Sequence, residues 1–295
     1  MGKITSLIEF NGSVGNVVGY KGRDGRNVIR FKVHDPRNPK TTLQMRRRVS
    51  WANLVNLWAA ITPYMHPSFN HKPAGQTDFN AFMSENVGVS PVFLTKKQAH
   101  QQECVVSPIM VTDGELPSIE TSLVSGGKLQ STIVIGDLTI SASTTIGNFS
   151  KAVLDNNPDF AEGDQITGLL VQQISVGTEG LPKVQVVAQR VVLDSTDTRM
   201  LADVLEAESG SADAMFSSVE GYLASKAGVN GGACWIHSRM VDGVTMVSTQ
   251  YLSVNNTILS SYSSAEAQTA AMRSYGVNEK YLTPSSNKYT AAASI

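Results

Sequence analysis

Residues 233–254, ACWIHSRMVDGVTMVSTQYLSV, decide the fold class more directly than any other stretch of the chain. β-Branched and aromatic residues lie on both sides of Asp242-Gly243, and an Asp-Gly pair between two such runs is typical of a two-residue β-hairpin turn. We therefore expect antiparallel strands at Ala233–Val241 and Val244–Val254.

Outward from this hairpin, the same patterns predict more strands and helices. The other predicted strands are Cys104–Val111, Leu129–Ile135, Leu138–Ser141, Ile166–Ser175 and Val184–Leu193, with a second hairpin turn at Gly136-Asp137. The predicted helices are Thr77–Asn86, Ile146–Asn156, Asp197–Glu208, Asp213–Lys226 and Ser263–Tyr275, before a Ser/Thr/Ala tail at Leu282–Ile295. The expected class is α+β, with a mostly antiparallel sheet or sandwich and flanking helices.

The N-terminal segment is predicted to form an extended β-hairpin arm that turns at Gly22–Arg26. Residues after the turn alternate, so that Ile29 and Phe31 lie on an apolar face and Arg30 and Lys32 on a basic one. An isolated hairpin is marginally stable in water. We therefore expect the arm to pair with its own domain or with a neighbouring subunit.

A helix is predicted to follow the arm, because Thr41 and Gln44 have the spacing of a capping box. Arg46–Arg48 then lie in its first turns, where cations oppose the helix dipole. This placement suggests a partner that neutralises them. Trp51 and Trp58 follow at helical spacing, where they can be core residues rather than exposed aromatics that bind nucleic acid.

Charge is distributed unevenly along the 295 residues. Residues 1–50 contain eleven Lys or Arg and three Asp or Glu, a net charge of +8, and the remainder of the chain carries −9. A basic head can bind nucleic acid, or it can meet the acidic surface of another copy of the chain. Composition does not choose between these.

Four domains or segments are expected. They are a β-hairpin arm at 1–35, a helical segment at 36–100, a β-rich core with inserted helices at 101–256, and a C-terminal helix and tail at 257–295. No charged-then-apolar leader and no run of 18 apolar residues is present, so neither a signal peptide nor a transmembrane span is predicted. We expect a soluble protein.

Motifs for catalysis, cofactors or metals are weak throughout. The glycine-rich stretch 12–25 lacks the Gly-Lys-Ser/Thr ending of a phosphate-binding loop, and His66 and His71 lack the further ligands that a metal needs. Cys234 and His237 are three residues apart on a predicted strand, which places them on opposite faces and disfavours a catalytic pair. We therefore expect a protein that is not an enzyme and has no catalytic residue, cofactor or metal.

The acidic stretch at 155–164 lacks the regular pattern of an EF-hand loop. We interpret it as a solvated acidic loop, which is also a candidate counterpart of the basic head. The predicted interface residues are Arg23, Arg26, Arg30, Lys32, Arg37, Arg46, Arg47, Arg48, Asp155, Asp159, Glu162 and Asp164.

The stretch GSVGNVVGYKG at 12–22, followed by Asn38-Pro39-Lys40-Thr41, Gln44 and Arg46–Arg48, resembles the N-terminal signature of an uncharacterised family of Bacteroidota and their phages, including crAss-like phages. The element 77–86 and the hairpin at 236–250 are similar to later parts of the same family. The resemblance is good over about the first 90 residues and extends to 96–230 only in layout. It implies a virion protein with no established activity.

The resemblance and the charge distribution together predict a non-enzymatic virion structural protein. We expect a homo-oligomeric ring or collar in the head–tail connector or tail, with portal, connector or tail proteins as neighbours and no membrane partner. Its expected location is the virion, and the host cytoplasm during assembly. The alternative is a nucleic-acid-associated protein, packaged with the genome, that binds DNA through the same basic residues.

Overall fold

The computed structural model describes residues 11–22, 25–33, 38–65, 68–176, 180–209, 214–255 and 258–282. Helices and antiparallel strands in several sheets make it an α+β protein, as the sequence predicts. The chain divides into two units, Met1–Lys40 and Thr41–Ile295, and each is described by itself. Residues 41–100, 101–256 and 257–295 of the expected organisation all lie in the second unit.

The first unit is a small antiparallel sheet with strand order β1-β2-β3. Its strands are β1 (Gly12–Val14), β2 (Val17–Lys21) and β3 (Asn27–Phe31). Strands β2 and β3 form the predicted hairpin, with Tyr20 opposite Val28. Strand β1 was not predicted, and it reaches β2 through a turn at Gly15, whose φ of 57° favours glycine.

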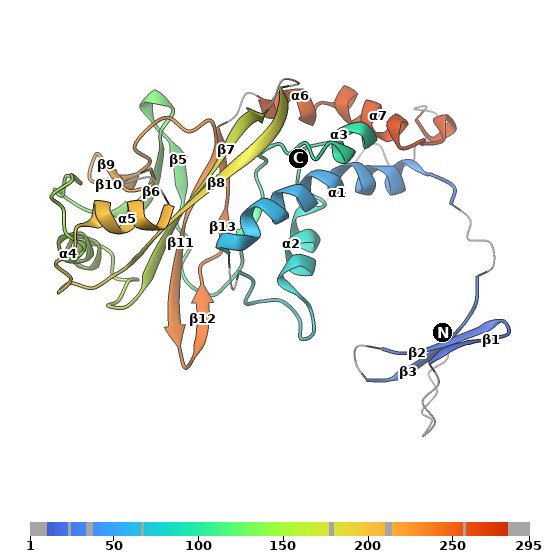
Figure 1. The fold of residues 1–295 in the computed structure, drawn as a ribbon, viewed down its shortest axis with the longest axis horizontal. Helices are drawn as coiled ribbons and strands as arrows, with labels where there is room; N and C mark the ends of the chain where they lie inside the picture. Colours follow the sequence, from blue (N-terminus) through green and yellow to red (C-terminus); the bar gives the residue numbers. More distant parts are fainter. Residues whose placement is uncertain are drawn as a thin grey trace. The chain divides into compact units, whose positions relative to one another are not determined.

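The main sheet of the second unit is built around the hairpin of residues 231–247, which turns at Asp242-Gly243 (Figure 1). Its strand order is β12-β11-β7-β8, for β12 (Val244–Val247), β11 (Gly231–Val241), β7 (Gln165–Val176) and β8 (Leu181–Val192); β14 (Ser253–Asn255) also pairs with β11. Asp242 and Gly243 both have positive φ, 50° and 77°, as a tight hairpin turn requires. The predicted turn and first strand are confirmed, but the second strand ends at Val247 rather than at Val254, and the residues after it form two short strands, of which only β14 pairs with β11.

Two smaller sheets lie beside the main sheet. One has strand order β5-β6-β10-β9, for β5 (Thr121–Leu123), β6 (Leu129–Val134), β10 (Tyr222–Ala224) and β9 (Ser217–Val219). The other pairs β4 (Met110–Thr112) with β13 (Gln250–Tyr251).

The helices are α1 (Thr42–Ile61), α2 (Asp78–Asn86), α3 (Lys96–His100), α4 (Ile146–Asn156), α5 (Leu201–Ser209), α6 (Ile258–Ser263) and α7 (Ala265–Ser274), with short 3-10 turns η1 (Thr62–Tyr64), η2 (Ser125–Gly127) and η3 (Glu279–Tyr281). The capping box of α1 is present, since Thr41 and Gln44 bond each other's backbone N–H groups. The bounds of α4 are those predicted from the sequence.

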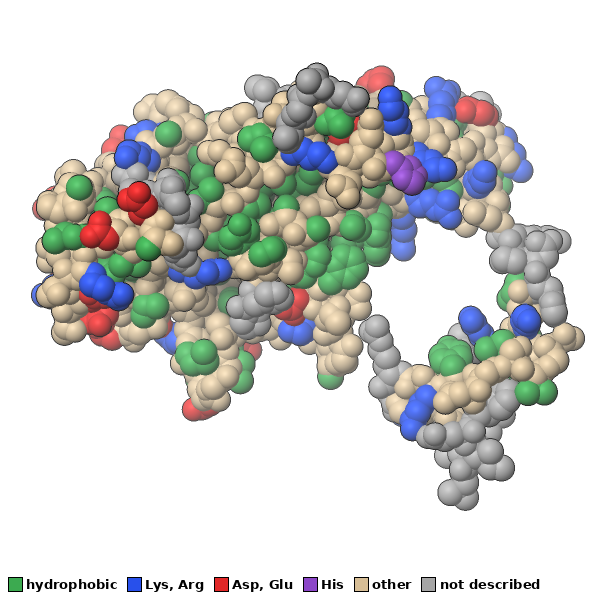
Figure 2. Space-filling model, in the orientation of Figure 1, with side chains coloured by type: hydrophobic (Ala, Val, Ile, Leu, Met, Phe, Trp, Pro, Cys, Tyr) green, Lys and Arg blue, Asp and Glu red, His purple; other side chains and the backbone are tan. Residues whose placement is uncertain are grey.

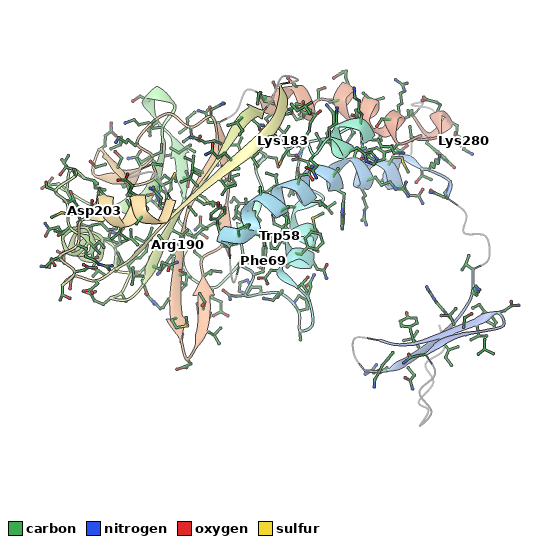
Figure 3. The ribbon with its side chains drawn as sticks, in the orientation of Figure 1. Trp58, Phe69, Lys183, Arg190, Asp203 and Lys280 are labelled. Carbon is green, nitrogen blue, oxygen red and sulfur yellow. The ribbon has the colours of Figure 1, made fainter. Side chains whose placement is uncertain are left out.

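Both faces of the main sheet are covered. On one face Leu169 and Ile236 pack against Leu54 and Leu57 of α1 and against residues of α2. Trp58 and Phe69 lie on this side of the sheet (Figure 3). The other face carries Trp235, which packs with residues of α4 and α5. The sheet is thus the central layer between two groups of helices.

Three predicted elements are wrong or incomplete. Residues 138–141 are not a strand, because β6 ends at Val134 and pairs with β10 instead. Residues 217–224 form the β9–β10 hairpin rather than a helix, with Glu220 and Gly221 at positive φ in its turn. Within Cys104–Val111 only the last two residues join a strand, and the preceding chain is extended and buried.

The C-terminal predictions hold in part. Helix α5 begins at Leu201 rather than at Asp197. The final helix is two helices, because Ser264 ends α6 and caps α7 through the N–H of Ala267. Residues 283–295 of the predicted tail lie outside the described residues.

Candidate functional site

The first candidate surface is the apolar face of the N-terminal sheet. The register of β1, β2 and β3 places Val14, Val17, Ile29 and Phe31 on the same face, as the sequence predicts for the last two. Phe31 is 79% exposed, and no apolar side chain among the described residues of this unit is buried. The sheet therefore presents an apolar face that its own described residues do not cover. We call these four residues the arm face.

The opposite side of the N-terminal sheet is partly basic. Arg30 lies with its guanidinium 5.7 Å from the centre of the Tyr20 ring, a cation–π contact across the β2–β3 pair. Arg26 and Lys32 are exposed. Arg23 and Arg37, also predicted as interface residues, lie outside the described residues.

The second candidate surface is the N-terminal half of α1. Arg47 and Arg48 are exposed, and Arg46 is half-buried, with a buried Nε that has no hydrogen-bond partner among the described residues. Trp51 is 45% exposed and so is not a core residue. Trp58 does pack inward, with its ring centre 5.0 Å from that of Phe82.

Packing adds basic residues that the sequence did not associate with α1. Helix α7 packs on α1 through Met272 against Met45 and Val49, and Lys96 at the start of α3 donates its backbone N–H to Ser274 Oγ at 2.9 Å. Lys and Arg side chains consequently gather at this end of the second unit (Figure 2). We call this group the basic end; its members are Arg46, Arg47, Arg48, Lys96, Lys97, His100 and Arg273.

The prediction that the acidic residues of 155–164 are solvated is correct for three of them and wrong for one. Asp155, Asp159 and Glu162 are exposed, at the end of α4 and in the loop after it. Asp164 is only 1% exposed and is engaged within its own unit. It is therefore not a solvated acid that can pair with another copy.

Asp164 belongs to a buried ion network at the start of β7. Its carboxylate accepts hydrogen bonds from Arg239 Nε and Nη2, both at 2.6 Å, and lies 2.7 Å from His237 Nε2. It also accepts the backbone N–H of Ala161 at 2.8 Å. The ring of Phe160 stacks on the His237 imidazole, with centres 4.2 Å apart.

The pKa values of Asp164 and His237 are both lowered in this network. Burial alone would raise the pKa of Asp164, but the hydrogen bonds from Arg239, Ala161 and His237 outweigh it and hold that pKa below its ordinary value. Burial lowers the pKa of His237, against the opposing effect of the Asp164 carboxylate. The stable arrangement is therefore an ionised Asp164–Arg239 pair beside a neutral imidazole, which ties the loop after α4 to β11.

A cavity of about 280 Å³ lies between the main sheet and η1. It is lined by side chains of the sheet and of η1, among them Gln165, Arg190, Ser238 and Met240. Arg190 donates to the carbonyl oxygen of Tyr64, and Gln165 donates to Thr167 Oγ1. These polar groups therefore bond to other parts of the protein.

The cysteines and histidines that were candidates for catalysis or metal binding lie in different parts of the structure. Cys104 and Cys234 are buried, and burial raises the pKa of each thiol to about 12. Cys234 faces the core shared with α1, and His237 lies on the opposite face of β11, as predicted. His71 contacts Asp113, whereas His66 lies outside the described residues.

The described part of the chain contains neither a cluster of metal ligands nor a helix that could span a membrane. No group of three or more His, Cys, Asp or Glu side chains there is placed to share a metal ion. No helix within those residues has both the length and the apolar character needed to cross a bilayer.

The fold and these surfaces define an α+β protein with a separate amphipathic N-terminal sheet and a basic helical end. Residues 9–133 match the model of a family of unknown function, DUF6266. The match begins before the N-terminal sheet and ends within β6, and it covers less than half of the chain. No curated protein and no solved structure matches the chain.

Proposed function

We propose that this chain is a non-enzymatic structural protein of a phage virion, which assembles through its N-terminal arm into a homo-oligomeric ring or collar. The observation that carries the proposal is the arm face. Among residues 11–22 and 25–33 no apolar side chain is buried, so these residues do little to stabilise the sheet alone, and an exposed apolar face is typical of an interaction site. Packing this face on another subunit removes it from water.

Charge supports a second copy of the chain as that subunit. Residues 1–40 contain eight Lys or Arg and three acids, whereas residues 41–295 contain sixteen Lys or Arg and twenty-two acids. A basic arm is therefore attracted to the acidic body of a neighbouring copy. The exposed Asp155, Asp159 and Glu162 are the acids we assign to this contact.

The virion context rests on the sequence resemblance to Bacteroidota and crAss-like phage proteins. In that context the chain acts in the head–tail connector or tail, beside portal, connector or tail proteins. It is found in the virion, and in the host cytoplasm while particles assemble.

The test compares two neighbouring acid substitutions on β1. Val14 lies on the arm face and Ser13 on the opposite side, and both are exposed. In light scattering at low and moderate salt, we expect the wild-type chain and Ser13→Asp to form the oligomer and Val14→Asp to lose it. Removal of residues 1–40, which leaves the α1 cap at Thr41 in place, should have the same effect as Val14→Asp. A mass unchanged by both alterations would overturn the arm as the assembly element.

A second candidate function is binding of nucleic acid, and the basic end favours it. Arg47 and Arg48 of α1 are exposed there, as are Lys96 and Lys97 of α3, a helix that contacts α1 from some 50 residues later in the chain. Contacts of this kind to phosphates weaken steeply with salt. The logarithm of the binding constant of the full chain for duplex DNA should then fall linearly with the logarithm of salt concentration. Such binding, if it is lost in Lys96→Glu/Lys97→Glu, would support this function over assembly.

A further inference from the structure

The outer face of α1 has the composition of a protein interface. Leu43, Arg47 and Trp51 are spaced four residues apart and so lie along one side of the helix. Leu43 is 54% exposed and Trp51 is 45% exposed, while the other sides of α1 pack against α7, α2 and the main sheet. Trp and Arg are the residue types that most often dominate binding energy at interfaces.

The opposite end of the same unit exposes acidic side chains together with some basic ones (Figure 2). Helices α4 and α5 lie at the end of the unit away from α3 and α7, and Asp203 of α5 and Lys280 of η3 are far apart (Figures 1 and 3). Exposed acids at the α5 end include Asp194, Asp203 and Glu206. Arg199, a cation of this end, is bonded to Asp197, with Nη2 2.6 Å from Oδ2.

We propose that the outer face of α1, formed by Leu43, Arg47, Arg48 and Trp51, binds the α5 end of a second copy of this chain in a head-to-tail contact. In this contact Arg47 and Arg48 pair with Asp203 and Glu206 of the second copy. The inference rests on the proposed function in requiring a homo-oligomer, but it concerns a different surface from the arm face.

The apolar residues also have a counterpart at the α5 end. Met200, immediately before α5, is 38% exposed, and a thioether contacts an aromatic ring favourably. Covering Leu43 and Trp51 with this edge removes both from water. Two different surfaces at opposite ends of one unit make the contact heterologous, which is the type that builds rings or filaments.

Charge argues against the two other occupants of the α1 face. The arm of the same chain is itself basic, and its cations would be repelled by Arg47 and Arg48. A nucleic acid would be attracted to these arginines but repelled by a body that carries an excess of six acids over residues 41–295. It would also leave the apolar Leu43 without a matching partner.

The test is a charge exchange in the full chain, followed by sedimentation velocity over a range of protein concentrations. Arg47→Glu/Arg48→Glu and Asp203→Lys/Glu206→Lys should each weaken assembly about tenfold or more, because like charges then face each other. An equimolar mixture of the two variants should assemble as well as the wild-type chain, since each contact between them is again between opposite charges. Glu115→Lys/Glu120→Lys is the matched control for Asp203→Lys/Glu206→Lys, with the same change in net charge on exposed residues elsewhere, and should assemble normally.

The outcomes separate this inference from the proposed function. Assembly that is lost in Val14→Asp but unaffected by both charge variants would overturn the α1–α5 contact and leave the arm proposal standing. Failure of the mixture to restore assembly would also overturn the contact, and so would loss of DNA retention in Arg47→Glu/Arg48→Glu without a change in mass. A wild-type chain that is monomeric throughout would overturn both proposals.

Discussion

Replacement of Asp164 by Asn tests how much the buried ion network stabilises the second unit. The carboxylate is 1% exposed and accepts four hydrogen bonds or contacts, two from Arg239, one from His237 and one from the Ala161 backbone. An amide of the same shape cannot accept all of them, because one of its two polar atoms is a donor. The substitution therefore leaves Arg239 without its anion.

The expected loss follows from the burial of each partner. Removing one partner of a buried ion pair costs about 3–5 kcal/mol. The side chain of Arg239 is 32% exposed, so water can take over part of the role of Asp164, and we expect the lower end, about 3 kcal/mol. This corresponds to a change of roughly two orders of magnitude in the unfolding equilibrium constant.

Urea unfolding followed by tryptophan fluorescence measures this loss, since Trp235 is buried on the strand that carries Arg239. Asp155→Asn is the matched control, because Asp155 is exposed, and it should change the free energy of unfolding by less than about 0.5 kcal/mol. A decrease of less than about 1 kcal/mol in the free energy of unfolding of Asp164→Asn would refute the reasoning, because it would show that the buried carboxylate contributes little to holding the loop after α4 against β11.

Three further predictions follow from the packing around the main sheet. Because the folded-state pKa of His237 is lowered, the unfolded chain binds the extra proton, so the free energy of unfolding should fall as the pH drops below about 6.5; urea titrations of wild type and His237→Gln should show this dependence only in the wild type. Gly168→Ala should cost about 1–3 kcal/mol in the same assay, because its Cβ would lie 2.6 Å from Met215 Cβ, whereas Gly88→Ala, with open space around it, should be neutral; equal losses would contradict this packing. Both cysteines should resist alkylation by iodoacetamide at pH 8 until the chain unfolds, since burial raises the pKa of each to about 12; rapid labelling of the native chain would contradict it.

Local signals in the sequence were sufficient for the elements with strong boundaries. The Asp242-Gly243 turn, the cap at Thr41 and the bounds of α4 all depend on residues close to one another in the chain. The β9–β10 hairpin was missed because its strands are short and its turn at Glu220-Gly221 lies within a stretch whose spacing resembles a helix.

The candidate site was only partly predictable, because its decisive contacts join distant residues. The burial of Asp164 requires Arg239, 75 positions later, to reach its carboxylate, and an acidic loop in the sequence gives no sign of this. The exposure of Trp51 depends on which side of α1 the C-terminal helices cover. Helical periodicity identifies a packed face, but it does not say how wide that face is.

In the proposed head-to-tail contact, the Arg46–Arg48 triplet would connect the stability of α1 to assembly. The three cations lie in the second turn of α1 and its first turn has no acidic residue, so they oppose the helix dipole only weakly, because the effect of the dipole falls off within the first turn. The capping box at Thr41 offsets part of this small cost, and acids from a second copy would offset more.

The arm face and the outer face of α1 both lie within residues 9–133, which match the family of unknown function, whereas Asp203 and Glu206 lie outside that match. A chain that shares only the matched part with this protein would therefore need its own acidic surface to bind α1 in such a contact.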